Sequence, residues 1–200
     1  MSEILIMAGA RTPFAAWNFG STGKGTPGGA LKDLDPQDLA AAALTGALSA
    51  ARLAPRDVNF IAFGNMYQVG PHGCYGARYV GHRAGCPNET TGVAVSLACG
   101  TGLLALTTAA DAVSRGDALL AAAVGADTPS RLRRDIFVPS FTDLSCGKHI
   151  AKTAEERAVG GKFDGPQLRM GFQEKSILVC RHLEHFPDCV IHRIGNGGNG

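Results

Sequence analysis

Aromatic residues are scarce in this sequence, at 6% of the chain with a single tryptophan, whereas glycine is abundant, with 27 residues. Large aromatic side chains therefore supply little of any core. Small residues let helices approach a sheet closely, so the composition favours an α/β fold. A content of 45% hydrophobic and 18% charged residues is typical of a soluble globular protein.

The sequence also lacks a large charge excess and a long apolar run. Lysine and arginine total 19 against 17 acidic residues, a net charge of +2, so we expect no binding to nucleic acid or to a membrane surface. No segment approaches the roughly 18 apolar residues of a membrane span. The opening residues 1–6 carry no basic stretch, which predicts no signal peptide and a cytoplasmic location.

A paired-cysteine motif is absent as well. The sequence has 6 cysteines and no C-x-x-C pair. Without a signal peptide we expect free thiols and not disulfides. The cysteines are Cys74, Cys86, Cys99, Cys146, Cys180 and Cys189.

Strand-like and helix-like segments alternate along the first part of the chain. Asp35 and Pro36 mark a helix start, and Gly116 marks a helix end. The βαβαβαβ order predicts a layered fold with helices on both faces of a mixed, mostly parallel sheet. The apolar strand at 118–125 should be covered on both faces. The predicted strands are 4–7, 58–63, 92–98 and 118–125, and the predicted helices are 37–52, 76–84 and 101–115.

The alternation stops after Gly125, where basic pairs, prolines and glycines follow. We therefore predict one α/β domain at 1–126 and an irregular remainder at 127–200. A short helix is expected near 153–158. A helix or strand is possible within 171–194, where Pro187 interrupts the pattern.

Cys99 stands where the strand predicted at 92–98 ends and a helix begins. This strand–turn–helix placement presents a nucleophile in other α/β enzymes. The free N–H groups and the dipole at a helix start favour a thiolate. Gly100 and Gly102 leave room for a substrate beside the sulfur. A small buried hydrophobic cysteine is the alternative, and position alone leaves both open.

The segment around Cys99 resembles the nucleophile segment of thiolases, and weaker matches to that family follow one another in the right order. Together they cover residues 3 to about 158 and predict a thiolase-like layered half with a remnant of the loop domain. The matching segments are Ala8–Phe14, Ala30–Leu34, Gly64–Gly70 with Ala77 and Arg78, Val95–Leu106, Gly125–Ser130 and Thr153–Glu155.

The resemblance implies acyl transfer between a cysteine and coenzyme A, by cleavage or formation of a 3-oxoacyl-CoA. It assigns the nucleophile role to Cys99 and a coenzyme A thioester as substrate, with no separate cofactor and no metal. It assigns no cofactor-binding residues. The family forms homo-oligomers, with pairing around the third strand and the loop near Gly64–Arg78.

Other catalytic motifs of the family are missing from these 200 residues. Family members are roughly twice as long, with two similar halves. The second half carries a Gly-His-Pro histidine, an Asn-Glu-Ala-Phe segment and a second cysteine, and none of these occurs here. Whether the chain is an enzyme therefore stays open. A truncated, non-catalytic thiolase-like protein is one alternative. Another condensing enzyme, such as a ketoacyl synthase, is a second, although Arg11–Phe14 argues against it.

Three further clusters allow functional interpretations. In each case we consider incidental clustering or an ordinary surface loop the better interpretation. A zinc site in the tail matches no common spacing. A phosphate-binding loop at 20–26 lacks its first glycine, since Asn18 holds that place. A basic turn after Asp127, which replaces a family glutamate, could contact a nucleotide phosphate. The zinc candidates are Cys180, His182, His185, Cys189 and His192, and the basic residues are Arg131, Arg133 and Arg134.

Overall fold

The structure, a computed structural model, describes residues 4–13, 29–132, 141–150, 152–153 and 175–180. The chain divides into two compact units, which are described separately. The first comprises Met1–Phe14, Leu34–Asp127 and Phe172–Gly200, and the second comprises Ala15–Asp33 and Thr128–Gly171.

The first unit contains a sheet and its helices. Its strands are β1 (Leu5–Arg11), β2 (Phe60–Gly64), β3 (Thr91–Val95), β4 (Leu120–Gly125) and β5 (Lys175–Cys180). Its helices are α1 (Pro36–Ala51), α2 (Gly76–Arg83) and α3 (Thr101–Arg115). Single 3-10 turns occur at η1 (Pro55–Asp57), η2 (Gly73–Tyr75) and η3 (Ala98–Gly100).

The sheet has the strand order β1-β5-β4-β2-β3. Strand β2 pairs in parallel with β3 and with β4, whereas β5 lies antiparallel between β1 and β4. One strand therefore runs against the other four. The predicted α/β class and the mixed, mostly parallel sheet are confirmed.

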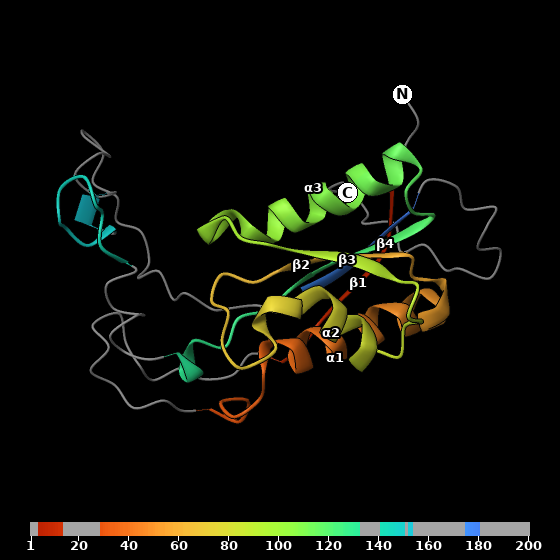
Figure 1. The fold of residues 1–200 in the computed structure, drawn as a ribbon, viewed down its shortest axis with the longest axis horizontal. Helices are drawn as coiled ribbons and strands as arrows, with labels where there is room; N and C mark the ends of the chain where they lie inside the picture. Colours follow the sequence, from red (N-terminus) through yellow and green to blue (C-terminus); the bar gives the residue numbers. More distant parts are fainter. Residues whose placement is uncertain (1–3, 14–28, 133–140, 151, 154–174, 181–200) are drawn as a thin grey trace, which may run out of the picture. The chain divides into compact units, whose positions relative to one another are not determined.

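Helices cover both faces of this sheet, as predicted (Figure 1). Helices α1 and α2 lie on one face and α3 on the other. Strand β4 is buried along its length up to Val124, which confirms that both of its faces are covered. Alanines fill much of the contact between α3 and the sheet, among them Ala62, Ala105, Ala109 and Ala121. Their small side chains allow the close approach that the composition predicts.

Local signals set two helix ends where the sequence places them. Helix α1 begins at Pro36 after Asp35, although the Asp35 side chain makes no capping hydrogen bond. Helix α3 ends at Gly116, which adopts the left-handed conformation (φ 82°). Glycine adopts that conformation without a steric penalty, which explains the sharp stop.

Strand β5 corrects the predicted domain boundary. Residues 175–180 lie in the predicted irregular remainder, within the segment where a helix or strand is possible, and they form an interior strand hydrogen-bonded on both sides. Leu178 and Cys180 are fully buried there. The prediction of a sheet domain confined to 1–126 is therefore wrong for this segment, because long-range pairing and not a local signal places it.

Strand β3 ends at Val95, earlier than the predicted end at 98. Its partner β2 also ends, at Gly64, which lies opposite Val95 in the register. Beyond this point the Leu97 N–H is bonded to the Thr101 hydroxyl and not to a neighbouring strand. Loss of the partner strand ends the ladder and starts the turn that contains Cys99.

The second unit is described only in part. It contains a 3-10 turn, η4 (Pro129–Arg131), and a bridge between Thr142 and His149. A helical turn begins at Ile150, where Lys152 and Thr153 N–H groups donate to the His149 carbonyl. Residues 154–158 of the helix predicted there lie outside the described residues. Among the helices that the structure describes, none has the length and apolar character needed to cross a membrane.

Candidate functional site: the Cys99 turn

Cys99 lies in η3, between the end of β3 and the first residue of α3. Its side chain is exposed, so the alternative of a buried hydrophobic cysteine is wrong. In the parallel part of the sheet, Gly64 of β2 lies opposite both Val95 of β3 and Gly125 of β4. The residues that follow these three strands therefore emerge at one edge, and Cys99 is among them.

The turn itself is unusual in its backbone. Ala98 adopts a positive φ of 43°, a conformation that residues with a Cβ rarely take. The Gly100 N–H donates to the Leu97 carbonyl at 2.8 Å, and the Thr101 N–H donates to the Ala98 carbonyl. The chain thus reverses tightly just before Cys99 and enters α3 directly after it.

The Thr101 hydroxyl makes two hydrogen bonds inside this turn. It accepts from the Leu97 N–H at 2.8 Å and donates to the Ala98 carbonyl at 2.7 Å. Thr101 is buried, unlike the residues just before it. This hydroxyl links the entry of the turn to the first residue of the helix, and nothing in the sequence pattern distinguished it.

Two glycines, Gly100 and Gly102, follow the cysteine, and the structure distinguishes them. A Cβ on Gly102 would meet no atom within 4 Å, so that position faces open space as expected. A Cβ on Gly100 would lie 3.1 Å from the Leu97 side chain, so that glycine accommodates Leu97. Leu97 and Leu103 are 59% and 67% exposed, which places apolar surface close to Cys99 in sequence on either side.

Asp127 lies at the same sheet edge, after β4. Its carboxylate accepts hydrogen bonds from the Asn65 side-chain amide (2.9 Å) and from the backbone N–H groups of Met66 (3.1 Å) and Tyr67 (2.9 Å). The Asn65 amide also donates to the Ala126 carbonyl at 2.7 Å. One carboxylate therefore fixes the segment that follows β2. The sequence indicates Asp127 only as a replacement for a family glutamate.

The remaining cysteines that the structure describes differ from one another. Cys74 and Cys146 are exposed, and Cys180 is buried in β5. Burial raises the pKa of the Cys86 thiol to about 11. Cys74, Cys86, Cys99 and Cys146 are free thiols, as predicted, and Cys189 lies outside the described residues.

The metal and phosphate candidates gain no support. Within the described ranges no group of three or more His, Cys, Asp or Glu side chains could hold a metal ion. Of the tail cluster only Cys180 is described, and the other four lie outside the described residues, as does the loop at 20–26.

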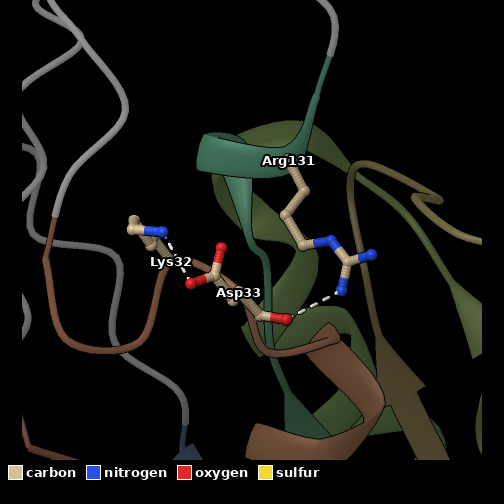
Figure 2. Close-up of polar contacts among 3 residues, drawn as sticks. All are labelled: Lys32, Asp33 and Arg131. Carbon is tan, nitrogen blue, oxygen red and sulfur yellow. Dashed lines mark hydrogen bonds and ion pairs between the residues drawn. The ribbon is translucent and has the colours of Figure 1, made fainter.

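The basic turn is visible at Arg131, in the second unit. Its guanidinium donates to the Asp33 backbone carbonyl at 3.1 Å (Figure 2). The Asp33 carboxylate pairs with Lys32 at 2.6 Å, and both of these side chains are exposed. Arg131 therefore has a structural contact, while Arg133 and Arg134 lie outside the described residues.

Comparison with known families gives one clear match. The family model described as "Thiolase, N-terminal domain" matches residues 4–163. Among characterised relatives, mitochondrial 3-ketoacyl-CoA thiolase of Bos taurus is 33% identical over 128 residues, which is 64% of this chain and 30% of that protein. Acetyl-CoA acetyltransferase of Syntrophomonas wolfei is 31% identical over 99% of this chain and 53% of its own length.

Solved structures show the same fold. Human mitochondrial 3-ketoacyl-CoA thiolase, determined in complex with CoA, superposes with a TM-score of 0.79 at 19% identity, over 95% of this chain and 68% of that chain. Acetyl-CoA acetyltransferase of Bacillus anthracis gives 0.66 at 25% identity, over 78% and 41%.

The chain therefore spans only part of the length of its characterised relatives, from 30% to 53% for the two proteins above. The family match nevertheless covers most of its residues and includes β1 to β4, the turn with Cys99 and the Asp127 contacts. On this evidence the chain belongs to the thiolase family.

Proposed function

We propose that this chain acts in acyl transfer between a cysteine and coenzyme A, with Cys99 as the acyl-accepting nucleophile. The observation that carries the proposal is the exposed thiol in η3, directly before α3 and at the carboxyl edge of the parallel strands. A turn between a strand and a helix presents the nucleophile in other α/β enzymes as well. An exposed thiol leaves a path for a thioester substrate.

The proposed reaction is the one the family resemblance implies. The Cys99 thiolate attacks the 3-keto carbon of a 3-oxoacyl-CoA, and the bond between C2 and C3 breaks. The electrons of that bond leave with acetyl-CoA as its enolate, which takes up a proton. The acyl group now on sulfur passes to the thiol of a second CoA, which restores the Cys99 thiolate. Condensation of two acetyl-CoA molecules is the reverse sequence.

The described residues supply the nucleophile and its turn. A base that activates the thiol and an acid that protonates the leaving enolate are not identified among them. Such groups act as a unit, and removing one costs most of the rate. We therefore propose that these 200 residues by themselves form the acyl-enzyme more readily than they turn over.

A non-catalytic thiolase-like protein is the second proposal. In this proposal Cys99 takes up the acyl group, but the group is not passed on to CoA. The ketoacyl synthase alternative gains no support, because the relatives compared above are thiolases and acetyltransferases.

A homo-oligomer is also proposed, built on the edge of the sheet. Strand β3 is the last strand in the order, and its residues are exposed or half-buried. Val93 is 40% exposed. An exposed edge strand carries unpaired N–H and C=O groups that pair readily with another strand. A role in fatty acid metabolism and a cytoplasmic location complete the proposal.

The experiment that tests the function is acyl labelling. The purified chain is incubated with acetoacetyl-CoA, and intact mass is recorded before and after CoA is added. We expect one acetyl adduct on the wild type and none on Cys99→Ala. Cys74→Ala removes another exposed thiol and is the matched control, which should label as the wild type does. Labelling without release of the acetyl group to CoA supports the non-catalytic proposal, and equal labelling of Cys99→Ala removes Cys99 as the nucleophile.

A further inference from the structure

The turn before Cys99 is held in a conformation that it would not adopt alone. Ala98 has a φ of 43°, and its Cβ makes this conformation unfavourable. Strained backbone of this kind persists only where neighbouring groups enforce it. The groups that enforce it therefore also determine where the next residue, Cys99, presents its sulfur.

The Thr101 hydroxyl is such a group. Its oxygen accepts the Leu97 N–H at 2.8 Å, and its proton goes to the Ala98 carbonyl at 2.7 Å. It therefore bonds to the two residues immediately before Cys99, from the residue two positions after it. One side-chain oxygen is therefore hydrogen-bonded to backbone groups on both sides of the strained φ angle of Ala98.

Thr101 is itself fixed in place. A Cβ on Gly64 would come within 3.0 Å of the Thr101 Cγ2 methyl and 3.2 Å of its carbonyl oxygen, so the threonine lies directly against the end of β2. The residue is only 6% exposed. The methyl group contacts β2 while the hydroxyl faces the turn, which leaves the side chain little freedom to rotate.

We propose that Thr101 is a positioning residue for Cys99: its hydroxyl holds the Ala98 turn so that the thiol stays at the start of α3. The reason for positioning Cys99 rests on the proposed function, whereas the positioning itself is a property of the turn. When the hydroxyl is lost the turn relaxes, and the thiol no longer keeps the fixed, exposed position from which it reacts. In this role Thr101 acts through Cys99 and not on the substrate.

Four variants of the 200-residue chain separate positioning from general stability. Thr101→Val keeps the shape and removes the hydroxyl. Thr101→Ser keeps the hydroxyl and removes the methyl, and Thr101→Ala differs from it by one oxygen atom. Thr108→Val is the matched control in the same helix. The Thr108 hydroxyl donates to the Leu104 carbonyl at 2.7 Å, and the residue lies about two turns beyond Thr101.

The measurement is the rate of alkylation of Cys99 by iodoacetamide at fixed pH, resolved by peptide mass and divided by the rate of Cys74 in the same molecule. We expect Thr101→Val, which removes both hydrogen bonds of the hydroxyl, to lower this ratio about tenfold. Thr101→Ser and Thr108→Val should stay within about twofold of the wild type, a change worth only a few tenths of a kcal/mol. Circular dichroism on heating records whether each variant is folded.

An unchanged ratio in Thr101→Val overturns the proposal, and so does an equal loss in Thr108→Val. If Thr101→Val does not fold, the Ser and Ala variants decide, and equal ratios in that pair overturn the proposal as well. Alkylation needs no acyl transfer. A chain that shows the hydroxyl dependence but takes up no acetyl group contradicts the proposed function and leaves the positioning role intact.

Discussion

The side-chain amide of Asn65 donates to the carboxylate of Asp127 at 2.9 Å, joining the residues that follow β2 and β4. The same carboxylate accepts the backbone N–H groups of Met66 and Tyr67. Hydrogen bonds to an ionised acceptor are stronger than neutral ones. The carboxyl edge of the sheet, where Cys99 also emerges, is therefore tied together by one acidic side chain.

Replacing Asp127 with alanine leaves these N–H donors without their acceptor. We expect Asp127→Ala to lower the free energy of unfolding by about 2 kcal/mol, measured by urea denaturation. The control is Asp117→Ala, which removes an exposed pair with Arg115 and should change stability by less than about 0.5 kcal/mol. Equal effects of the two substitutions contradict a special role for the Asp127 contacts.

Cys86 and Cys74 should respond to pH in different ways. Burial raises the pKa of Cys86 from 9.0 to about 11, because the charged thiolate loses its hydration. We expect iodoacetamide to modify exposed Cys74 faster than Cys86, and the rate at Cys86 to keep rising with pH until about 11. Peptide mass after timed quenching checks this. Rapid alkylation of Cys86 in the folded chain at pH 8 contradicts it.

The same pKa shift has a consequence for stability, and its sign follows from proton binding. Between pH 9 and about 11 the unfolded thiol has lost its proton while the folded one retains it. The folded state then binds more protons, so the contribution of Cys86 is fully present below pH 9 and is lost as pH rises to about 11. In Cys86→Ala the fall in stability over this window should be smaller than in the wild type. Identical slopes contradict the shift.

The place of β5 in the sheet can be tested at Leu178, which is fully buried. Leu178→Ala should lower the free energy of unfolding by about 3 kcal/mol, because it removes buried methyl groups and leaves a cavity. Leu119→Ala, at a position 54% exposed, is the control and should cost less than about 0.5 kcal/mol. If Leu178→Ala leaves the free energy of unfolding unchanged, residues 175–180 are not part of the sheet.

Self-association through β3 is tested at Val93. Lysine at this edge-strand position places an unpaired charge in a strand-to-strand contact, so Val93→Lys should weaken self-association about tenfold or more in sedimentation experiments. Ile6→Lys is the matched control, because Ile6 lies on β1 at the opposite edge of the sheet and is 48% exposed. If Val93→Lys associates as strongly as the wild type, β3 is not part of the interface.

Local signals explain what the sequence predicts well. Pro36 starts α1 and Gly116 ends α3, since each residue type favours that backbone position whatever surrounds it. The position of Cys99 between strand and helix follows from the same kind of signal. These features need no knowledge of distant residues.

Long-range contacts explain what the sequence does not predict. The sequence leaves a helix or strand possible around Lys175–Cys180. The segment becomes a strand because it pairs with both β1 and β4, a condition that no six-residue pattern records. The Asn65–Asp127 bond joins residues 62 positions apart. The Thr101 hydroxyl is local in sequence, yet its role depends on the positive φ of Ala98, and alanine carries no signal for that conformation.

The central claim is that Cys99 accepts the acyl group, and the most direct measurement is to locate that group. The chain is incubated with acetoacetyl-CoA, quenched with acid and digested, and the modified peptide is sequenced by tandem mass spectrometry. We predict the acetyl group on Cys99, and its loss from Cys99 when CoA is added before the quench. An acetyl group found on Cys74 or Cys146 at the same level as on Cys99, or on none of them, contradicts the account.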